Sequence, residues 1–238
     1  MKNNSDDNSS SRSTPERRDE AGHTDPMIWN GCLDMLAGDA LELRNALADA
    51  AHGSDWDLAF TLLDENPHSL SPNVWRPQGK SWFTPLHQAA WSNAPIAVVE
   101  ELLGRGAWKF LTTSSGETAS EIALRRGHTE LATVLTPEVP WRFDIEIYKK
   151  LDHQLAQLVE SRIRPQLEVQ LRHPSCVVLT EHPETPLWYP IPGMYGGFNI
   201  QLMCNYLYVE SWCRVAGGSG QAHVVTTEGF TLVDEGFV

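Results

Sequence analysis

The sequence predicts an α+β protein in which a series of stacked helix pairs precedes a small domain of one long helix and an antiparallel β-meander. Three observations carry this prediction. A helix-pair signature spans 84–107, an apolar period of three to four residues spans 145–163, and an apolar period of two begins at Val177. Periods near 3.6 and 2 are typical of helices and strands that bury one face. We therefore expect a helical region at 27–136 and an α+β domain at 137–238.

The segment 1–26 differs in composition from the rest of the chain. It is dominated by Asn, Ser, Asp and Arg and holds almost no apolar side chains. Such a composition buries too little surface to offset the entropy of ordering, so we expect a disordered tail. It also lacks the apolar stretch of a secretory signal. No segment of the chain approaches the roughly 20 apolar residues that cross a bilayer, so we expect no membrane partner.

The segment 84–107 has the features of two helices joined by a turn. Thr84 and Pro85 suit a helix start, where a hydroxyl caps free N–H groups and the missing N–H of proline is harmless. The apolar stripe of the second helix comprises Val98, Val99, Leu102 and Leu103. Gly106 supplies the left-handed turn that ends the unit. A helix pair of this kind cannot bury its apolar face alone and implies stacked neighbours.

Weaker copies of this unit flank it on both sides. Thr118 lies 34 residues after Thr84, and 127–135 resembles the second half of the unit. Upstream, the 12-residue step from Ala51 to Leu63 matches the step from Ala90 to Leu102. The period is within about one residue of the roughly 33 that is typical of ankyrin repeats.

The run Thr84-Pro85-Leu86-His87-Gln88-Ala89-Ala90, with its 34-residue spacing, resembles an ankyrin repeat. We expect about three repeats over 40–136, with the outer ones degenerate and the connection from Pro67 to Trp82 longer than the family pattern. The segments 188–198 and 210–215 are similar to the tail of uncharacterised bacterial ankyrin-repeat proteins. That resemblance implies an architecture and brings no activity with it.

Beyond two prolines at 137 and 140, apolar residues recur at helical spacing from Ile145 to Ile163, which predicts a long amphipathic helix ended by Pro165. A shorter helix through Leu167 and Leu171 is the next candidate. The expected strands are Val177–Thr180, Leu187–Ile191, Gly197–Met203, Tyr206–Val215, Gln221–Thr226 and Phe230–Val233. Short turns between successive strands favour an antiparallel meander.

The strand from Tyr206 alternates clearly. One face carries Leu207, Val209, Ser211, Cys213 and Val215. The other face carries Tyr208, Glu210, Trp212 and Arg214. We expect the long helix to cover the apolar face.

Charge and cysteine usage narrow the class of partner and the compartment. The net charge of −13 is spread along the chain, and no region is basic, so we expect no nucleic-acid partner. An even acidic surface commonly serves solubility alone; the sharper interpretation is a protein partner with a basic surface. The four cysteines form no C-x-x-C pair, which indicates a reduced, cytoplasmic protein. The nine histidines and four cysteines show no close-spaced set of metal ligands, so we expect no metal, and we expect no cofactor.

Ankyrin repeats bind partners through loop tips and the exposed side of each first helix. Carried across position by position, the resemblance implies that the partner-binding residues are Lys80, Ser81, Phe83, Trp91, Ser92, Ser114, Ser115, Glu117, Arg125 and Arg126. Trp91 carries most weight because Trp and Arg dominate interface energetics. The alternative is that Trp82 and Trp91 pack against the long insertion at Pro67–Lys80 or against the second domain. Trp82 also stands where the repeat pattern has Gly, which puts the turn shape there in question.

The predicted function is therefore a non-catalytic interaction module, an adaptor or inhibitor that binds a protein through its ankyrin face. An immunity or antitoxin role is one concrete form. The competing hypothesis is an enzyme or small-ligand sensor on the C-terminal sheet, with the repeats as a recruiting module. There Glu210, Arg214 and His223 would act as acid, anion clamp and base. Cross-strand charged pairs on a solvated sheet give the same pattern without catalysis.

Overall fold

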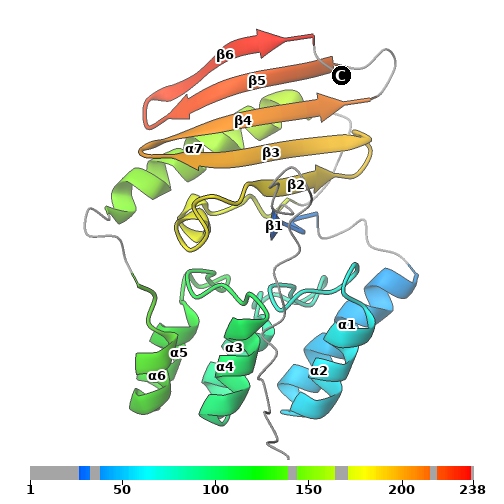
Figure 1. The fold of residues 1–238 in the computed structure, drawn as a ribbon, viewed down its shortest axis with the longest axis vertical. Coiled ribbons are helices and arrows are strands. Elements are labelled where there is room, and N and C mark those ends of the chain that lie inside the picture. The colour runs from blue at the N-terminus through cyan, green and yellow to red at the C-terminus, as the bar shows by residue number, and fades with distance from the viewer. Residues whose placement is uncertain (1–26, 33–37, 139–143, 164–170, 215–218, 237–238) are drawn as a thin grey trace, which may run out of the picture.

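The structure is a computed structural model that describes residues 27–32, 38–138, 144–163, 171–214 and 219–236. It confirms the α+β class, with helices first and the sheet second (Figure 1). The predicted tail at 1–26, most of the shorter helix predicted around 167–171, and Val215 at the end of the predicted fourth strand lie outside the described residues.

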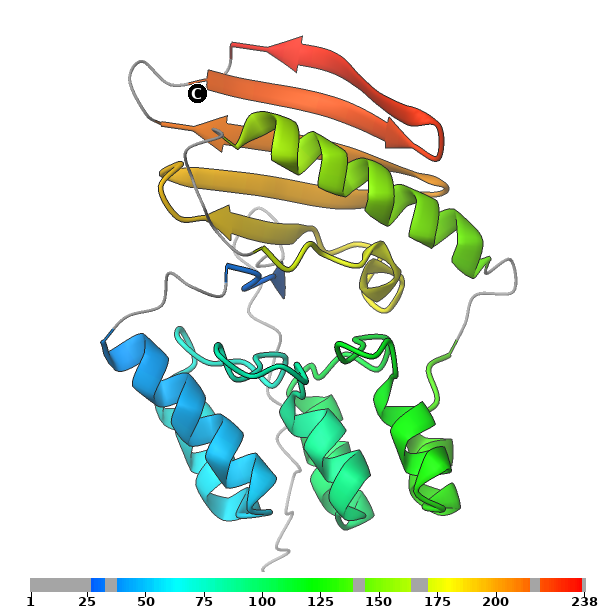
Figure 2. The same cartoon turned by 180° about the vertical axis from the view of Figure 1, so that it is seen from behind.

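The helical half consists of three helix pairs that stand side by side (Figure 1). Their bounds are α1 (Asp39–His52), α2 (Trp56–Glu65), α3 (Pro85–Ser92), α4 (Ile96–Gly104), α5 (Ala119–Arg125) and α6 (Thr129–Leu135). The two helices of each pair pack together, and α3 packs between α1 and α5. The loops that join successive pairs point toward the sheet (Figures 1 and 2).

Local sequence sets the ends of these helices. Thr84 and Thr118 are the N-caps of α3 and α5, and each forms a capping box with the side chain three residues later. Gly106 and Gly127 follow the last residues of α4 and α5 with φ of 84° and 82°, where a side chain would be strained. Leu102 on α4 is fully buried, as the predicted apolar stripe requires.

The sheet half contains one long helix, a short 3₁₀ helix and a six-stranded sheet within the described residues. Their bounds are α7 (Ile145–Arg162), η1 (Cys176–Thr180), β1 (Met27–Ile28), β2 (Leu187–Ile191), β3 (Gly196–Met203), β4 (Tyr206–Cys213), β5 (Ser219–Thr226) and β6 (Gly229–Glu235). The strands lie in the order β1-β2-β3-β4-β5-β6. From β2 to β6 each strand is antiparallel to the next, which confirms the predicted meander.

Helix α7 crosses one face of the sheet (Figure 2). Leu151, Leu155 and Leu158 on α7 are buried in one cluster with Leu207 and Val209 on β4. The alternation predicted for this strand is therefore correct, and its apolar face is the one that α7 covers.

Two features of the sheet half differ from the prediction. Residues 177–180, expected as a strand, lie in the 3₁₀ helix η1. The Asp152 carboxylate on α7 accepts hydrogen bonds from the Ser175 hydroxyl and the Cys176 N–H, 2.9 and 2.6 Å away, and so holds the start of η1. A short buried apolar run is compatible with either element, so its own period did not distinguish them.

The second difference concerns residues 27–32, which the prediction places with the helices. Met27 and Ile28 form β1 and pair parallel to Leu187 and Trp188 of β2. Cys32 forms an isolated bridge with Leu171. The chain therefore begins its described part in the sheet half before it enters the helical half.

The two halves share a buried core. Trp75, Trp108 and Leu111, from the loops of the helical half, lie in the same apolar cluster as Tyr189 and Phe198 of the sheet. A wholly separate helical domain would leave these large side chains in water. The loop tips of the helical half are thus partly covered by the sheet half.

Candidate functional site

The residues predicted to bind a partner remain accessible in most cases. Among those on the loop tips, Lys80, Ser81, Ser114 and Ser115 are exposed, whereas Phe83 and Glu117 are half-buried. Among those on the helices, Trp91, Ser92, Arg125 and Arg126 are exposed. The sheet half therefore leaves this part of the helical half open.

Trp91 is the centre of an exposed aromatic and cationic cluster. Its side chain projects from α3 and is 38% exposed. The Phe83 ring meets it edge-on, with ring centroids 6.0 Å apart. The guanidinium carbons of Arg126 and Arg125 lie 4.2 and 5.6 Å from the centre of the Trp91 ring. We call the four residues Phe83, Trp91, Arg125 and Arg126 the Trp91 surface.

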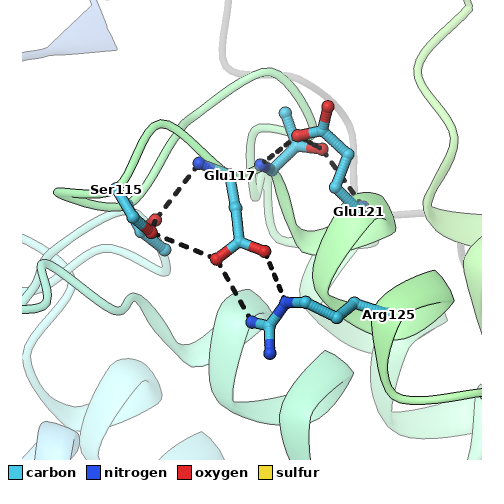
Figure 3. A network of polar contacts seen from close by, with 6 residues as sticks. Ser115, Glu117, Glu121 and Arg125 are labelled. Carbon is cyan, nitrogen blue, oxygen red and sulfur yellow. Dashed lines mark hydrogen bonds and ion pairs between the residues drawn. The ribbon is translucent and has the colours of Figure 1, made fainter.

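Arg125 is held in place by a carboxylate from the preceding loop (Figure 3). Two of its guanidinium nitrogens donate to the two Glu117 oxygens at 2.6 and 3.1 Å. The Ser115 hydroxyl donates to the same carboxylate at 3.1 Å. The hydrogen bonds from Arg125 are the main cause that lowers the pKa of Glu117, so this group is ionised at neutral pH.

The loops that carry the tip residues are tied to each other below the surface. The Ser114 N–H donates to the Ser81 carbonyl at 3.0 Å. The Thr84 N–H donates to Nδ1 of His87, and Nε2 of that ring lies 3.0 Å from the Leu111 carbonyl. His87 is 1% exposed and bridges two turns, so its role is structural. These bonds bring the two tips into one surface.

Trp82 belongs to the packing between the halves, as the alternative hypothesis for this residue expected. Its backbone φ of 57° is the left-handed conformation that glycine favours, so the turn keeps its shape without glycine. Its ring contacts the Arg172 guanidinium, 4.6 Å from the ring centre.

Two of the three residues of the competing hypothesis, Glu210 and His223, do not lie together. Glu210 pairs with Ala222 and Val209 pairs with His223, which puts Glu210 and His223 on opposite faces of the sheet. His223 faces α7 and is 6% exposed, and burial lowers its pKa, with the Arg162 charge adding to the effect. The Glu210 carboxylate instead accepts a hydrogen bond from the Asn199 amide.

Sequence reasoning missed an aromatic pocket on the sheet half. It has a volume of about 430 Å³ and is lined by Trp188, Tyr195, Gly196, Trp212 and Arg214. A Cβ on Gly196 would lie 2.1 Å from the Trp212 carbonyl oxygen, so glycine is required there. Tyr195 is 77% exposed at a φ of 49°, an unusual backbone conformation for an aromatic residue. The Gly196-Gly197 pair beside Tyr195 is the sequence signal for this close approach.

We inspected the described part of the chain for metal ligands and for membrane-spanning helices. No group of three or more His, Cys, Asp or Glu side chains among the described residues is placed to hold a metal ion. In the same residues no helix is long and apolar enough to cross a membrane. A scan against protein-family models and a search of curated proteins both give no match for this chain.

Proposed function

We propose that this chain is a non-catalytic ankyrin-repeat adaptor or inhibitor that binds another protein through the Trp91 surface and the adjoining loop tips. The observation behind this proposal is an exposed tryptophan in contact with two arginines, on a surface whose loops are joined by a hydrogen bond. Trp and Arg are the side chains that most often dominate protein–protein binding energy.

The ankyrin part of the proposal is supported by the repetition of local structure. Three helix pairs stand side by side, and the capped helices α3 and α5 start 34 residues apart. His87 links its own turn to the next one through the Leu111 carbonyl. Stacked units of this kind make a continuous surface from equivalent positions of neighbouring units, which is where Trp91 and Arg125 lie.

A cytoplasmic location fits the cysteines. Cys32 and Cys176 are buried free thiols, and all four cysteines are unpaired. Thiols persist in a reducing compartment. An immunity or antitoxin role remains one concrete form of the inhibitor hypothesis, because a small protein that blocks another protein needs only a binding surface.

The decisive experiment removes the two hot-spot candidates together. The full chain, immobilised, is used to capture its partner from the cytoplasm of its own cells, and the affinity of the purified partner is then measured. Trp91→Ala with Arg125→Ala should weaken capture by more than about 2 kcal/mol. Unfolding stability should change by only about 0.5 kcal/mol, because both side chains are exposed.

The matched control is Tyr195→Ala with Arg214→Ala, an exposed aromatic residue and an arginine on the sheet half. It should leave capture unchanged. If it abolishes capture while the Trp91 pair leaves capture intact, the proposal is wrong.

A second candidate function then takes its place, namely a small-ligand site in the aromatic pocket around Trp188, Trp212 and Arg214. The favouring observation is the exposed, strained Tyr195 at the rim of that pocket. Concave aromatic sites with one charged group are common ligand sites.

A further inference from the structure

Two arginines lie beside Trp91 in a chain whose net charge is −13. Arg125 is the last residue of α5 and Arg126 is its C-cap, and both are exposed. Two carboxylates of the same region, Glu117 and Glu121, already accept hydrogen bonds within the protein. The Glu117 carboxylate binds Arg125, and the Glu121 carboxylate accepts from the N–H and hydroxyl of Thr118, at 2.8 and 2.9 Å (Figure 3).

Of the two arginines at Trp91, Arg126 is the one that no carboxylate of the described residues binds. It makes no ion pair with any residue of the described part of the chain, and its guanidinium lies over the Trp91 ring at 4.2 Å. Stacking on an aromatic face leaves the edge of the planar guanidinium free to donate hydrogen bonds. A carboxylate is the group that accepts two parallel hydrogen bonds from that edge.

The surface is also pre-organised for such a ligand. The two-point bond to Glu117 holds Arg125, the stack on Trp91 holds Arg126, and the edge-on contact with Phe83 holds Trp91. A binding surface that is already ordered loses less side-chain entropy when its partner arrives.

From these contacts we infer that the Trp91 surface recognises an acidic protein segment. A carboxylate of the segment binds Arg126, and an apolar side chain beside it packs on the exposed part of Trp91 and on Phe83. This inference rests on the proposed protein-binding function and names the chemistry of the partner. The net charge of the chain predicts a basic partner, whereas the local charges predict an acidic segment at the point of contact.

The test selects ligands from a random library, so it does not depend on the natural partner. A displayed library of random short peptides is enriched on the immobilised full chain, and the enriched sequences are read. We expect an excess of Asp and Glu next to an aromatic or aliphatic residue. One enriched peptide is then synthesised and its affinity measured against variants.

Arg126→Glu should weaken that peptide about tenfold or more, because attraction becomes repulsion at the carboxylate. Arg126→Lys should have a smaller effect, since it keeps the charge and loses the planar fork. Lys150→Glu, the same charge change at an exposed position on α7, should leave the affinity unchanged.

The outcomes separate this inference from the proposed function. Enriched peptides that are neutral or basic, but still lose affinity in Trp91→Ala, overturn the acidic segment and leave the binding surface in place. Acidic peptides whose affinity for Arg126→Glu equals their affinity for the unmodified chain also overturn the acidic segment. Peptides whose affinity is unchanged in Trp91→Ala, or no enrichment at all, also overturn the acidic segment, whereas the proposed function is overturned only by the capture experiment.

Discussion

At the scale of single residues, His87 shows how one buried side chain organises a turn. The Thr84 N–H donates to Nδ1, so Nδ1 carries no proton and Nε2–H is the donor to the Leu111 carbonyl. A second proton on Nδ1 would face the Thr84 N–H directly. Burial is the main reason that the pKa of His87 falls from 6.5 to about 4.

This pKa predicts a pH dependence of stability. The unfolded chain binds a proton at His87 below about pH 6.5, whereas the folded chain does so only near pH 4. The stabilisation is therefore complete above pH 6.5 and is lost as the pH falls, by about 2 kcal/mol between pH 7 and pH 5. Urea unfolding at both pH values measures it. His87→Gln should remove this part of the slope, and an unchanged slope would contradict the prediction.

Two arginines that lie on tryptophan rings differ in their exposure to solvent. Arg126 on Trp91 is open to solvent, while Arg172 is 6% exposed and lies over three tryptophan rings, Trp75, Trp82 and Trp29, at 4.1, 4.6 and 5.3 Å. Arg126 can therefore contact a partner, whereas Arg172 stabilises the packing of the protein itself.

At the scale of elements, the helix pairs depend on the apolar stripe of each second helix. Leu102 of α4 is fully buried in a cluster that includes Leu86 and Ala89 of α3, together with Ile122 of α5. The helices are too short to be stable in isolation, so this burial is what holds them.

Leu102→Ala should therefore lower the free energy of unfolding by roughly 2–5 kcal/mol, because the short helices cannot close the cavity that it leaves. Chemical unfolding followed by circular dichroism measures the change. The matched control is Leu124→Ala on α5, where the side chain is 57% exposed and the expected change is below about 0.5 kcal/mol. Equal effects at both positions would mean that the predicted burial is wrong.

At the scale of the whole molecule, a small set of contacts joins the halves. The Arg172 guanidinium donates to the Thr112 carbonyl at 2.6 Å, and the Glu181 carboxylate accepts from the N–H groups of Lys109 and Phe110 at 2.9 and 2.8 Å. These bonds, together with the contacts between Arg172 and the three tryptophan rings, hold the loops of the helical half against the sheet half.

Arg172→Ala should cost about 3 kcal/mol of unfolding free energy, because it uncovers three aromatic rings and leaves the partly buried Thr112 carbonyl without its donor. Arg126→Ala, which removes an arginine from one exposed ring, should cost less than about 1 kcal/mol.

Because the core is shared, the unmodified chain should unfold in one transition that is the same by circular dichroism and by tryptophan fluorescence. Two separate transitions would show that the halves are independent.

The sequence by itself determined the elements whose signals are local. The capping residues Thr84 and Thr118, the glycine at 106, the helical period from Ile145 and the alternation from Tyr206 all predict structure within a few residues of themselves. These elements occur where predicted because capping, left-handed turns and one-sided burial are decided by near neighbours along the chain.

Only the tertiary structure decided the rest. Whether 177–180 became a strand or a 3₁₀ helix depended on Asp152, which is distant in sequence. The place of β1 depended on a partner strand about 160 residues later. The contact of Trp91 with Arg126 and the separation of Glu210 from His223 follow from how helices stack and how strands align in register. Periodicity shows that a side chain is exposed or buried, whereas its neighbours across the fold are set only when the elements pack.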